Sequence, residues 1–133
     1  MKIEHVAIWV KDIDKVCEFY RKYFDGVVHP IYHNPAKQFT SRFVTFDDGA
    51  RLEIMHRPDI DVETEAMFHV EHSEHLGFAH LSFSVGSKEE VDRLTQQMSA
   101  DGIQVVGQPR TTGDGYYESV VLDPEGNRVE ITV

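Results

Sequence analysis

The sequence predicts an α+β fold: two βαβββ modules forming a cupped mixed β-sheet, with the helices on its outer face. One observation is that a strand, a helix and further strands follow one another twice within 133 residues. Another is that a histidine and a glutamate each recur at nearly the same distance along the chain: His80 follows His5 by 75 residues, and Glu130 follows Glu53 by 77. Such self-similarity is typical of a duplicated supersecondary unit.

The first module opens with a strand and a helix. Apolar and polar residues alternate over residues 3–10, as they do in a strand with one buried face. From Asp12 to Phe24 large apolar residues recur every three or four positions, which predicts an amphipathic helix. Gly26 is expected to end this helix, because glycine tolerates the left-handed conformation found at helix ends.

Three further strands complete the first module. One is expected around residues 27–32. The runs at residues 43–46 and 51–55 flank an Asp-Asp-Gly turn, and such a turn between two apolar runs indicates a β-hairpin.

The stretch at residues 56–76 shows no clear period and carries many charges. We therefore expect a first module at residues 1–60, a connection at 61–76 and a second module at 77–133, all within one functional domain. A short helix is compatible with residues 62–72.

The second module repeats the order of the first. Residues 80–85 alternate like the first strand, and Ser87 followed by Glu90 predicts a capping box at the start of a helix. Gly102 is expected to end that helix. Its buried stripe is expected to consist of Val91, Leu94 and Met98. Three strands are expected to follow, at residues 104–106, 119–122 and 128–133.

Composition excludes several classes of function. The formal net charge is −10, and nucleic acids and anionic membrane surfaces both need a basic face, so neither is an expected partner. No apolar run approaches the ~20 residues of a membrane-spanning helix, and the N-terminus lacks a secretion signal. The single cysteine, Cys17, cannot form an internal disulfide, so a cytoplasmic location is expected.

Four polar residues are distinguished by their position in the strands. His5, Glu53, His80 and Glu130 each lie on the face of a strand opposite to its apolar residues. If the sheets curl, these faces line a cleft, where two imidazoles and two carboxylates suit Zn²⁺, Ni²⁺, Co²⁺, Mn²⁺ or Fe²⁺. Such an ion keeps open positions for water or substrate. The alternative is that all four are ordinary polar residues on solvent-facing strands.

Other reactive side chains give less specific signals. His69, His72 and His75 have a spacing that can ligate metal, but they lie in the aperiodic connection, where solvated loop histidines are the alternative. Cys17 lies within the first helix without an evident activating partner for its thiol. Tyr116 follows a Gly-Asp-Gly loop, so its ring can line a cleft or simply pack.

The strand and turn motifs resemble those of a known superfamily. They are HVAIWVKD at residues 5–12, FYRKYFDG at 19–26, ARLEIM at 50–55, LGFAHLSFSV at 76–85 and LDPEGNRVEI at 122–131. Together they resemble the vicinal oxygen chelate superfamily, which contains glyoxalase I, fosfomycin-resistance proteins, extradiol dioxygenases, methylmalonyl-CoA epimerase and bleomycin-binding proteins. The resemblance covers essentially the whole chain. It implies paired βαβββ modules that form a metal site for stabilising an oxyanion on a bound substrate.

The set of His5, Glu53, His80 and Glu130 is most similar to that of glyoxalase I, or lactoylglutathione lyase. The resemblance implies that these four residues bind a divalent metal ion, Ni²⁺, Co²⁺ or Zn²⁺. It also implies that Glu130 is the general base and Glu53 its counterpart. The implied activity is that of a metal-dependent lyase or isomerase on a small oxygenated substrate, such as the hemithioacetal of methylglyoxal and a thiol.

Substrate contacts are expected from Trp9, Arg42 and Tyr116. Trp9 stands where glyoxalase I has an arginine for glutathione, so the identity of the thiol stays open. The resemblance implies a homodimer, in which the site forms either within one chain or between two subunits.

Three alternatives stay open at this point. The first is a fosfomycin-type thiol transferase, with Arg42, Arg51 and Arg110 available for a phosphonate. The second is another metal-dependent member such as an extradiol dioxygenase or an epimerase, although a glutamine usually stands in the epimerase at the position of Glu53. The third is a metal-free drug-binding resistance module, which usually lacks the ligand residues.

Overall fold

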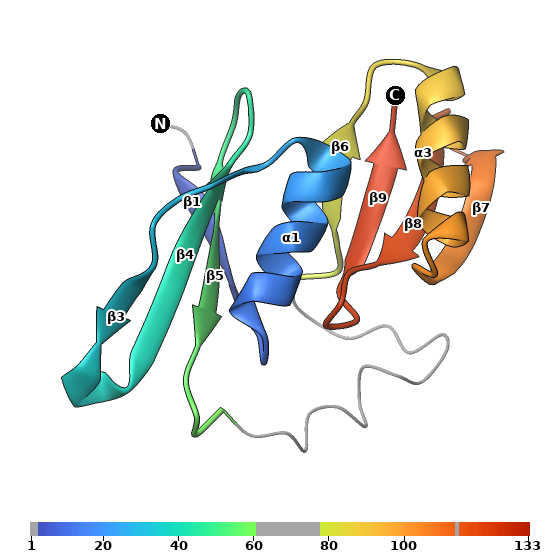
Figure 1. Cartoon of the computed structure of the whole chain (residues 1–133). Coiled ribbons are helices and arrows are strands. Elements are labelled where there is room, and N and C mark those ends of the chain that lie inside the picture. The colour runs from blue at the N-terminus through green and yellow to red at the C-terminus, as the bar shows by residue number, and fades with distance from the viewer. Residues whose placement is uncertain (1–2, 61–77, 114) are drawn as a thin grey trace. The chain divides into compact units, whose positions relative to one another are not determined.

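The structure, a computed structural model, describes residues 3–60, 78–113 and 115–133. The chain divides into two compact units, Met1–Thr64 and Glu65–Val133. Among the described residues, each unit has one α-helix packed on a mixed β-sheet (Figure 1). The predicted α+β class is therefore confirmed. No helix in these ranges is long and apolar enough to cross a membrane.

The first unit contains β1 (His5–Trp9), α1 (Ile13–Phe24), β2 (Val27–Val28), β3 (Tyr32–Asn34), β4 (Phe39–Thr45) and β5 (Arg51–His56), with a 3₁₀ turn at Pro35–Lys37. The sheet order is β1-β5-β4-β2, and β3 pairs with β4 outside this path. Strand β1 is parallel to β5, and the other pairings are antiparallel. The predicted hairpin is the β4–β5 pair.

The second unit contains β6 (Leu81–Ser84), α3 (Lys88–Ala100), β7 (Val105–Thr111), β8 (Tyr117–Leu122) and β9 (Arg128–Thr132). Its sheet order is β6-β9-β8-β7, and only the β6–β9 pair of these described strands is parallel. This is the order of β1-β5-β4-β2 in the first unit. The two units are therefore copies of one βαβββ plan, and β3 is an addition to the first.

One face of each sheet is buried beneath its helix. Alternation predicts this face correctly, because Leu52 and Ile54 in β5 are buried, as are Val129 and Ile131 in β9. The helices contribute to the two cores Val16, Phe19, Tyr20, Val91, Leu94 and Met98. The residues between these buried positions form the opposite face of each sheet. The predicted site residues lie on that face.

The first helix begins and ends at the predicted residues. The carboxylate of Asp12 accepts a hydrogen bond from the backbone N–H of Lys15 at 2.9 Å, which caps the helix start. The helix ends at Phe24, as predicted, and its C-cap Asp25 takes the left-handed conformation (φ 52°) just before Gly26. Gly26 is also needed for space, because a Cβ there would lie 2.6 Å from Cγ1 of Val44.

The second helix is capped by one half of the predicted box. The hydroxyl of Ser87 accepts a hydrogen bond from the backbone N–H of Glu90 at 3.2 Å. The Glu90 carboxylate accepts from the guanidinium of Arg93, one turn along the helix. Gly102, two residues after the helix, has φ 83° and terminates it as predicted.

Proline explains two differences between the predicted and the observed strands. The strand expected at residues 27–32 is divided into β2 and β3, with Pro30 between them, and proline cannot donate a ladder hydrogen bond. Strand β7 is longer than the predicted 104–106 because it continues through Pro109. Proline is tolerated there since β7 is the last strand in its sheet order.

Candidate functional site

His5 and Glu53 meet on the face of the first sheet that α1 does not cover. They lie on the neighbouring parallel strands β1 and β5, where Ala7 is the register partner of Glu53. Residues two apart on a strand share a face, so both side chains project to the same side. The His5 Nε2 atom lies 3.9 Å from Oε2 of Glu53, whose side chain is 17% exposed.

His80 and Glu130 form the corresponding pair in the second unit. Glu130 lies in β9, and His80 directly precedes β6, the parallel neighbour of β9. The His80 Nε2 atom lies 3.2 Å from Oε2 of Glu130, whose side chain is 18% exposed. Each unit thus places one imidazole against one partly buried carboxylate.

The spacing within each pair fits two ligands of one metal ion. Nitrogen and oxygen ligands lie roughly 2.0–2.2 Å from ions such as Zn²⁺, so two of them can be at most about 4.4 Å apart. The separations of 3.9 Å and 3.2 Å both satisfy this limit. Within the described residues no cluster contains three or more potential ligands, so each unit by itself supplies two.

Glu4 belongs to the surroundings of His5, although the sequence patterns do not single it out. Its Oε2 lies 2.5 Å from Nδ1 of His5, and its other oxygen pairs with the guanidinium of Arg51. The hydrogen bond from His5, and after it the Arg51 charge, hold the pKa of Glu4 below its ordinary value. The only sequence feature that points to this contact is the position of an acidic residue directly before a candidate metal ligand.

Trp9 lies on the same face of β1 as His5, at the other end of the strand. Its side chain is partly exposed and packs edge-on against Phe39, with ring centroids 6.1 Å apart. The guanidinium of Arg57 lies 5.5 Å from the centre of the indole. Trp9 is therefore an accessible aromatic surface beside the His5–Glu53 pair.

Arg42 is not brought to this face. In the β4–β5 pair its register partner is Ile54, a core residue beneath α1, and its Nη1 lies 3.6 Å from the carboxylate of Asp14. The neighbouring position, Phe43, is the one opposite Glu53. The geometry gives no support to a substrate contact by Arg42.

Cys17 is buried in α1, and burial raises the pKa of its thiol to about 11. The thiolate is the nucleophilic form of cysteine, and little of it exists at neutral pH with such a pKa. Its environment is that of a core residue, as the sequence interpretation expected.

Tyr116 and its neighbour have different surroundings. Tyr116 is exposed in the turn directly before β8, and its carbonyl accepts a hydrogen bond from the N–H of Thr112. Tyr117 points to the helix side, where its hydroxyl donates to Asp92 at 2.7 Å. That hydrogen bond raises the pKa of Tyr117. Of the two rings, only Tyr116 is open to a ligand.

Arg110 lies on the same face as Glu130. It is the register partner of Glu118 in β8, and its Nη2 lies 3.7 Å from the Glu118 carboxylate. A Cβ on Gly107 would be 3.2 Å from Nη1 of Arg110 and equally near Val120, which is the register partner of Glu130. The guanidinium thus lies across the strand beside the Glu130 position.

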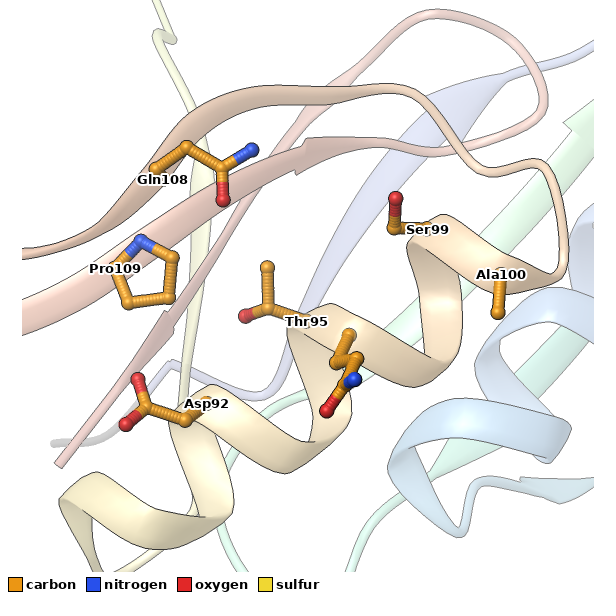
Figure 2. Close-up of a pocket in the computed structure, with 7 residues that line it drawn as sticks. Asp92, Thr95, Ser99, Ala100, Gln108 and Pro109 are labelled. Atoms are coloured by element: carbon orange, nitrogen blue, oxygen red, sulfur yellow. The ribbon is translucent and has the colours of Figure 1, made fainter.

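A cavity of about 400 Å³ lies elsewhere in the second unit, between α3 and β7. Asp92 on the helix and Gln108 and Pro109 on the strand are among its lining residues (Figure 2). It opens on the helix side of the sheet, and none of the candidate site residues lines it. The three histidines at positions 69, 72 and 75 lie outside the described residues.

Comparison with known proteins gives related sequences and folds. The chain is 25% identical over 132 residues to the uncharacterized protein YqjT of Bacillus subtilis (strain 168), covering 97% of this chain and 96% of that protein. It is 25% identical to SMU.1112c, whose crystal structure matches with a TM-score of 0.76 over 100% of this chain and 98% of the other.

The fold is also that of glyoxalase I from Zea mays, at 18% identity and a TM-score of 0.76. That match covers 98% of this chain and 44% of the maize protein. The sequence profile of one family matches residues 2–131, nearly the whole chain. The duplicated βαβββ units and this match lead to one conclusion: the chain belongs to the Glyoxalase/Bleomycin resistance protein/Dioxygenase superfamily.

Proposed function

We propose that the protein is a metal-dependent lyase or isomerase of the glyoxalase I type. The observation that carries the proposal is the repeated His–Glu pair, found at metal-ligand spacing on the helix-free face of both sheets. Superfamily membership supports it, because the superfamily includes glyoxalase I enzymes. The proposed substrate is a small oxygenated compound, such as the hemithioacetal of methylglyoxal and a low-molecular-weight thiol.

His5, Glu53, His80 and Glu130 are the proposed ligands of one divalent ion, Ni²⁺, Co²⁺ or Zn²⁺. Two nitrogen and two oxygen donors suit these ions. When bound, the ion supplies positive charge that stabilises a developing oxyanion on the substrate. The four ligands come from one chain or from two copies in a homodimer, and both arrangements satisfy the proposal.

Glu130 is the proposed general base, and Glu53 its counterpart in the first unit. In the hemithioacetal, Glu130 would remove the proton from the carbon that bears sulfur and return it to the neighbouring carbonyl carbon. The hydroxyl then becomes the thioester carbonyl and the ketone becomes a hydroxyl, so no external oxidant or reductant is required. The Glu130 side chain is 18% exposed, which keeps the carboxylate within reach of a ligand and largely away from bulk water.

Substrate positioning is assigned to residues on the same faces. The exposed part of Trp9 offers an apolar surface for the carbon chain of the substrate or thiol. Tyr116 offers an exposed phenol in the second unit. Neither side chain carries the positive charge that would bind a carboxylate of glutathione. A smaller thiol compound, or one with fewer carboxylates, is therefore equally compatible.

The test is turnover by the metal-loaded protein, with methylglyoxal mixed with glutathione, cysteine or coenzyme A, followed as thioester formation. We expect Ni²⁺, Co²⁺ or Zn²⁺ to support turnover, and Glu130→Gln to lower kcat by ~10²–10⁴, the usual contribution of a general base. Glu118→Gln, on the same face, is the matched control and should leave kcat within a few-fold of wild type. Metal binding without turnover of any thiol adduct would refute the lyase assignment.

A fosfomycin-type thiol transferase is the second candidate, because Arg110 places a cation on the Glu130 face. A phosphonate would suit that guanidinium. Consumption of thiol with an epoxide phosphonate, lost in Arg110→Ala, would favour it over the lyase. His80→Ala separates both enzymes from a metal-free binding module, since it should abolish metal binding and turnover but spare a metal-free binder.

A further inference from the structure

The two His–Glu pairs are alike in spacing but differ in what holds the histidine. In the first unit, Nδ1 of His5 lies 2.5 Å from the Glu4 carboxylate, on the opposite side of the ring from Nε2. In the second unit, the residue directly before His80 is Ala79. Alanine has no acceptor to offer, so the second imidazole has no equivalent partner at that position.

The Glu4 contact decides which ring nitrogen of His5 carries the hydrogen. An ionised carboxylate can only accept, so Nδ1 must be the donor. In the neutral imidazole this leaves the lone pair on Nε2, the atom that lies 3.9 Å from Glu53. A neutral imidazole with a free lone pair is the form that binds metal ions, and metal-ligating histidines commonly donate their other N–H to a carboxylate.

Glu4 is itself held in place from the neighbouring strand. The guanidinium of Arg51, the register partner of His5, forms an ion pair with it. Arg51 also lies over the ring of Phe43, 4.0 Å from its centre, and Phe43 packs edge-on against the His5 ring at 5.7 Å. The imidazole is therefore fixed by a carboxylate on one side and an aromatic ring on another.

The second unit also lacks an aromatic residue at the position that corresponds to Phe43. Phe43 is the register partner of Glu53, and the residue that pairs with Glu130 in the same way is Val120. Both the acid and the aromatic that hold His5 thus have small aliphatic residues as counterparts. The chain thus allows a comparison between His5, which has both of these contacts, and His80, whose counterpart positions hold Ala79 and Val120.

We propose that Glu4 is a positioning residue that fixes His5 in the tautomer with hydrogen on Nδ1, making His5 and Glu53 the preorganised half of the metal site. The part of this proposal that concerns metal affinity rests on the proposed function. The part that concerns the tautomer does not, because it follows from contacts among the protein's own residues.

The tautomer is tested on the metal-free, full-length protein by NMR of the ring nitrogens, at a pH where the histidines are neutral. We expect His5 to show a protonated Nδ1 and an unprotonated Nε2 in wild type, and a mixture of tautomers in Glu4→Ala. His80 should show the same signals in both proteins. A wild-type His5 that already shows mixed tautomers, or one unchanged by Glu4→Ala, would overturn the proposal.

The second test measures Ni²⁺ and Zn²⁺ affinity by competition with a coloured chelator. Loss of such an outer carboxylate typically lowers metal affinity about 10–100-fold, which is the change expected for Glu4→Ala. Glu4→Gln should lose less, because its amide oxygen still accepts from Nδ1. Glu18→Ala, which removes an exposed carboxylate bound to Arg21 on α1, is the matched control and should change nothing.

The two tests separate failure of the inference from failure of the proposed function. If wild type binds no divalent metal, the proposed function fails, and the nitrogen signals still decide whether Glu4 positions His5. If wild type binds metal and Glu4→Ala binds it equally well, the positioning role is wrong and the four-ligand proposal is untouched.

Discussion

The position of a residue relative to its strand decides how well its role can be read from the sequence. His5, Glu53 and Glu130 lie within strands, so alternation correctly predicts the face on which each side chain lies. Glu4 falls within the predicted strand at residues 3–10, where alternation puts it on the face opposite His5. In the structure β1 begins only at His5, so alternation does not apply to Glu4 and its contact with His5 was not predicted. Arg42 lies within β4, but its face depends on the register with β5, which the sequence pattern does not specify.

Cys17 gives a prediction on pH at the scale of one residue. Because the pKa of its thiol is raised to about 11 from a reference of 9.0, the unfolded state loses this proton first as the pH rises. The thiol's contribution to the free energy of unfolding should be complete below pH 9 and decline between pH 9 and 11.

Urea unfolding of wild type and Cys17→Ala across pH 7 to 10.5 measures this contribution. The stability difference between the two proteins should shrink as the pH rises, after allowing for the constant cost of the substitution. Parallel pH profiles would show that the thiol does not experience the buried environment described here.

Elements were predicted from periodicity, and their errors have local causes. Both helices appear at the predicted positions because each presents a regular apolar stripe to its sheet. The ends of the strands were predicted less accurately. Pro30 interrupts one predicted strand, and another continues through Pro109, although the sequence pattern suggests that it stops earlier. Proline restricts the backbone in both cases, but only the sheet order shows whether a strand can accept it.

The join between α1 and β2 provides a prediction at the scale of elements. Gly26→Ala would place a Cβ 2.6 Å from Val44 Cγ1 and 3.0 Å from the carbonyl oxygen of Tyr20, and the backbone atom cannot move aside cheaply. We expect a loss of about 1–3 kcal/mol in the free energy of unfolding, the usual cost of overpacking.

Gly113→Ala is the control for this substitution, since a Cβ there meets nothing within 4 Å and the residue does not have a positive φ. Its stability should stay within ~0.5 kcal/mol of wild type. Equal losses in the two variants, measured by urea unfolding, would show that close packing at Gly26 is not the cause.

At the scale of the whole molecule, duplication was the most informative property of the sequence. Equal spacings predicted two copies of one unit, and the matching sheet orders bear this out. Spacing alone could not reveal that the copies hold their histidines differently, because that difference depends on the side chains at positions 4 and 43. The proposal of one metal ion bound by ligands from both units is also made at this scale.

Metal removal tests that proposal on the complete protein. An ion that binds only the folded chain adds to its stability, by about 2.7 kcal/mol when its free concentration is 100 times Kd. We expect a chelator to lower Tm, and added Ni²⁺ or Zn²⁺ to restore it. The Tm of His80→Ala should be the same with and without the ion. An identical Tm for wild type with chelator and with metal would contradict a native metal site.

Strand β7 has a consequence for the solubility of the folded protein. Among the described strands it ends the order of its sheet, and an unpaired strand margin can recruit strands from neighbouring molecules into aggregates. Pro109 removes one donor from that margin, and two shifts in register interrupt the regular ladder between β7 and β8. We therefore expect the irregularity that obscured this strand in the sequence to disfavour edge-to-edge polymerisation.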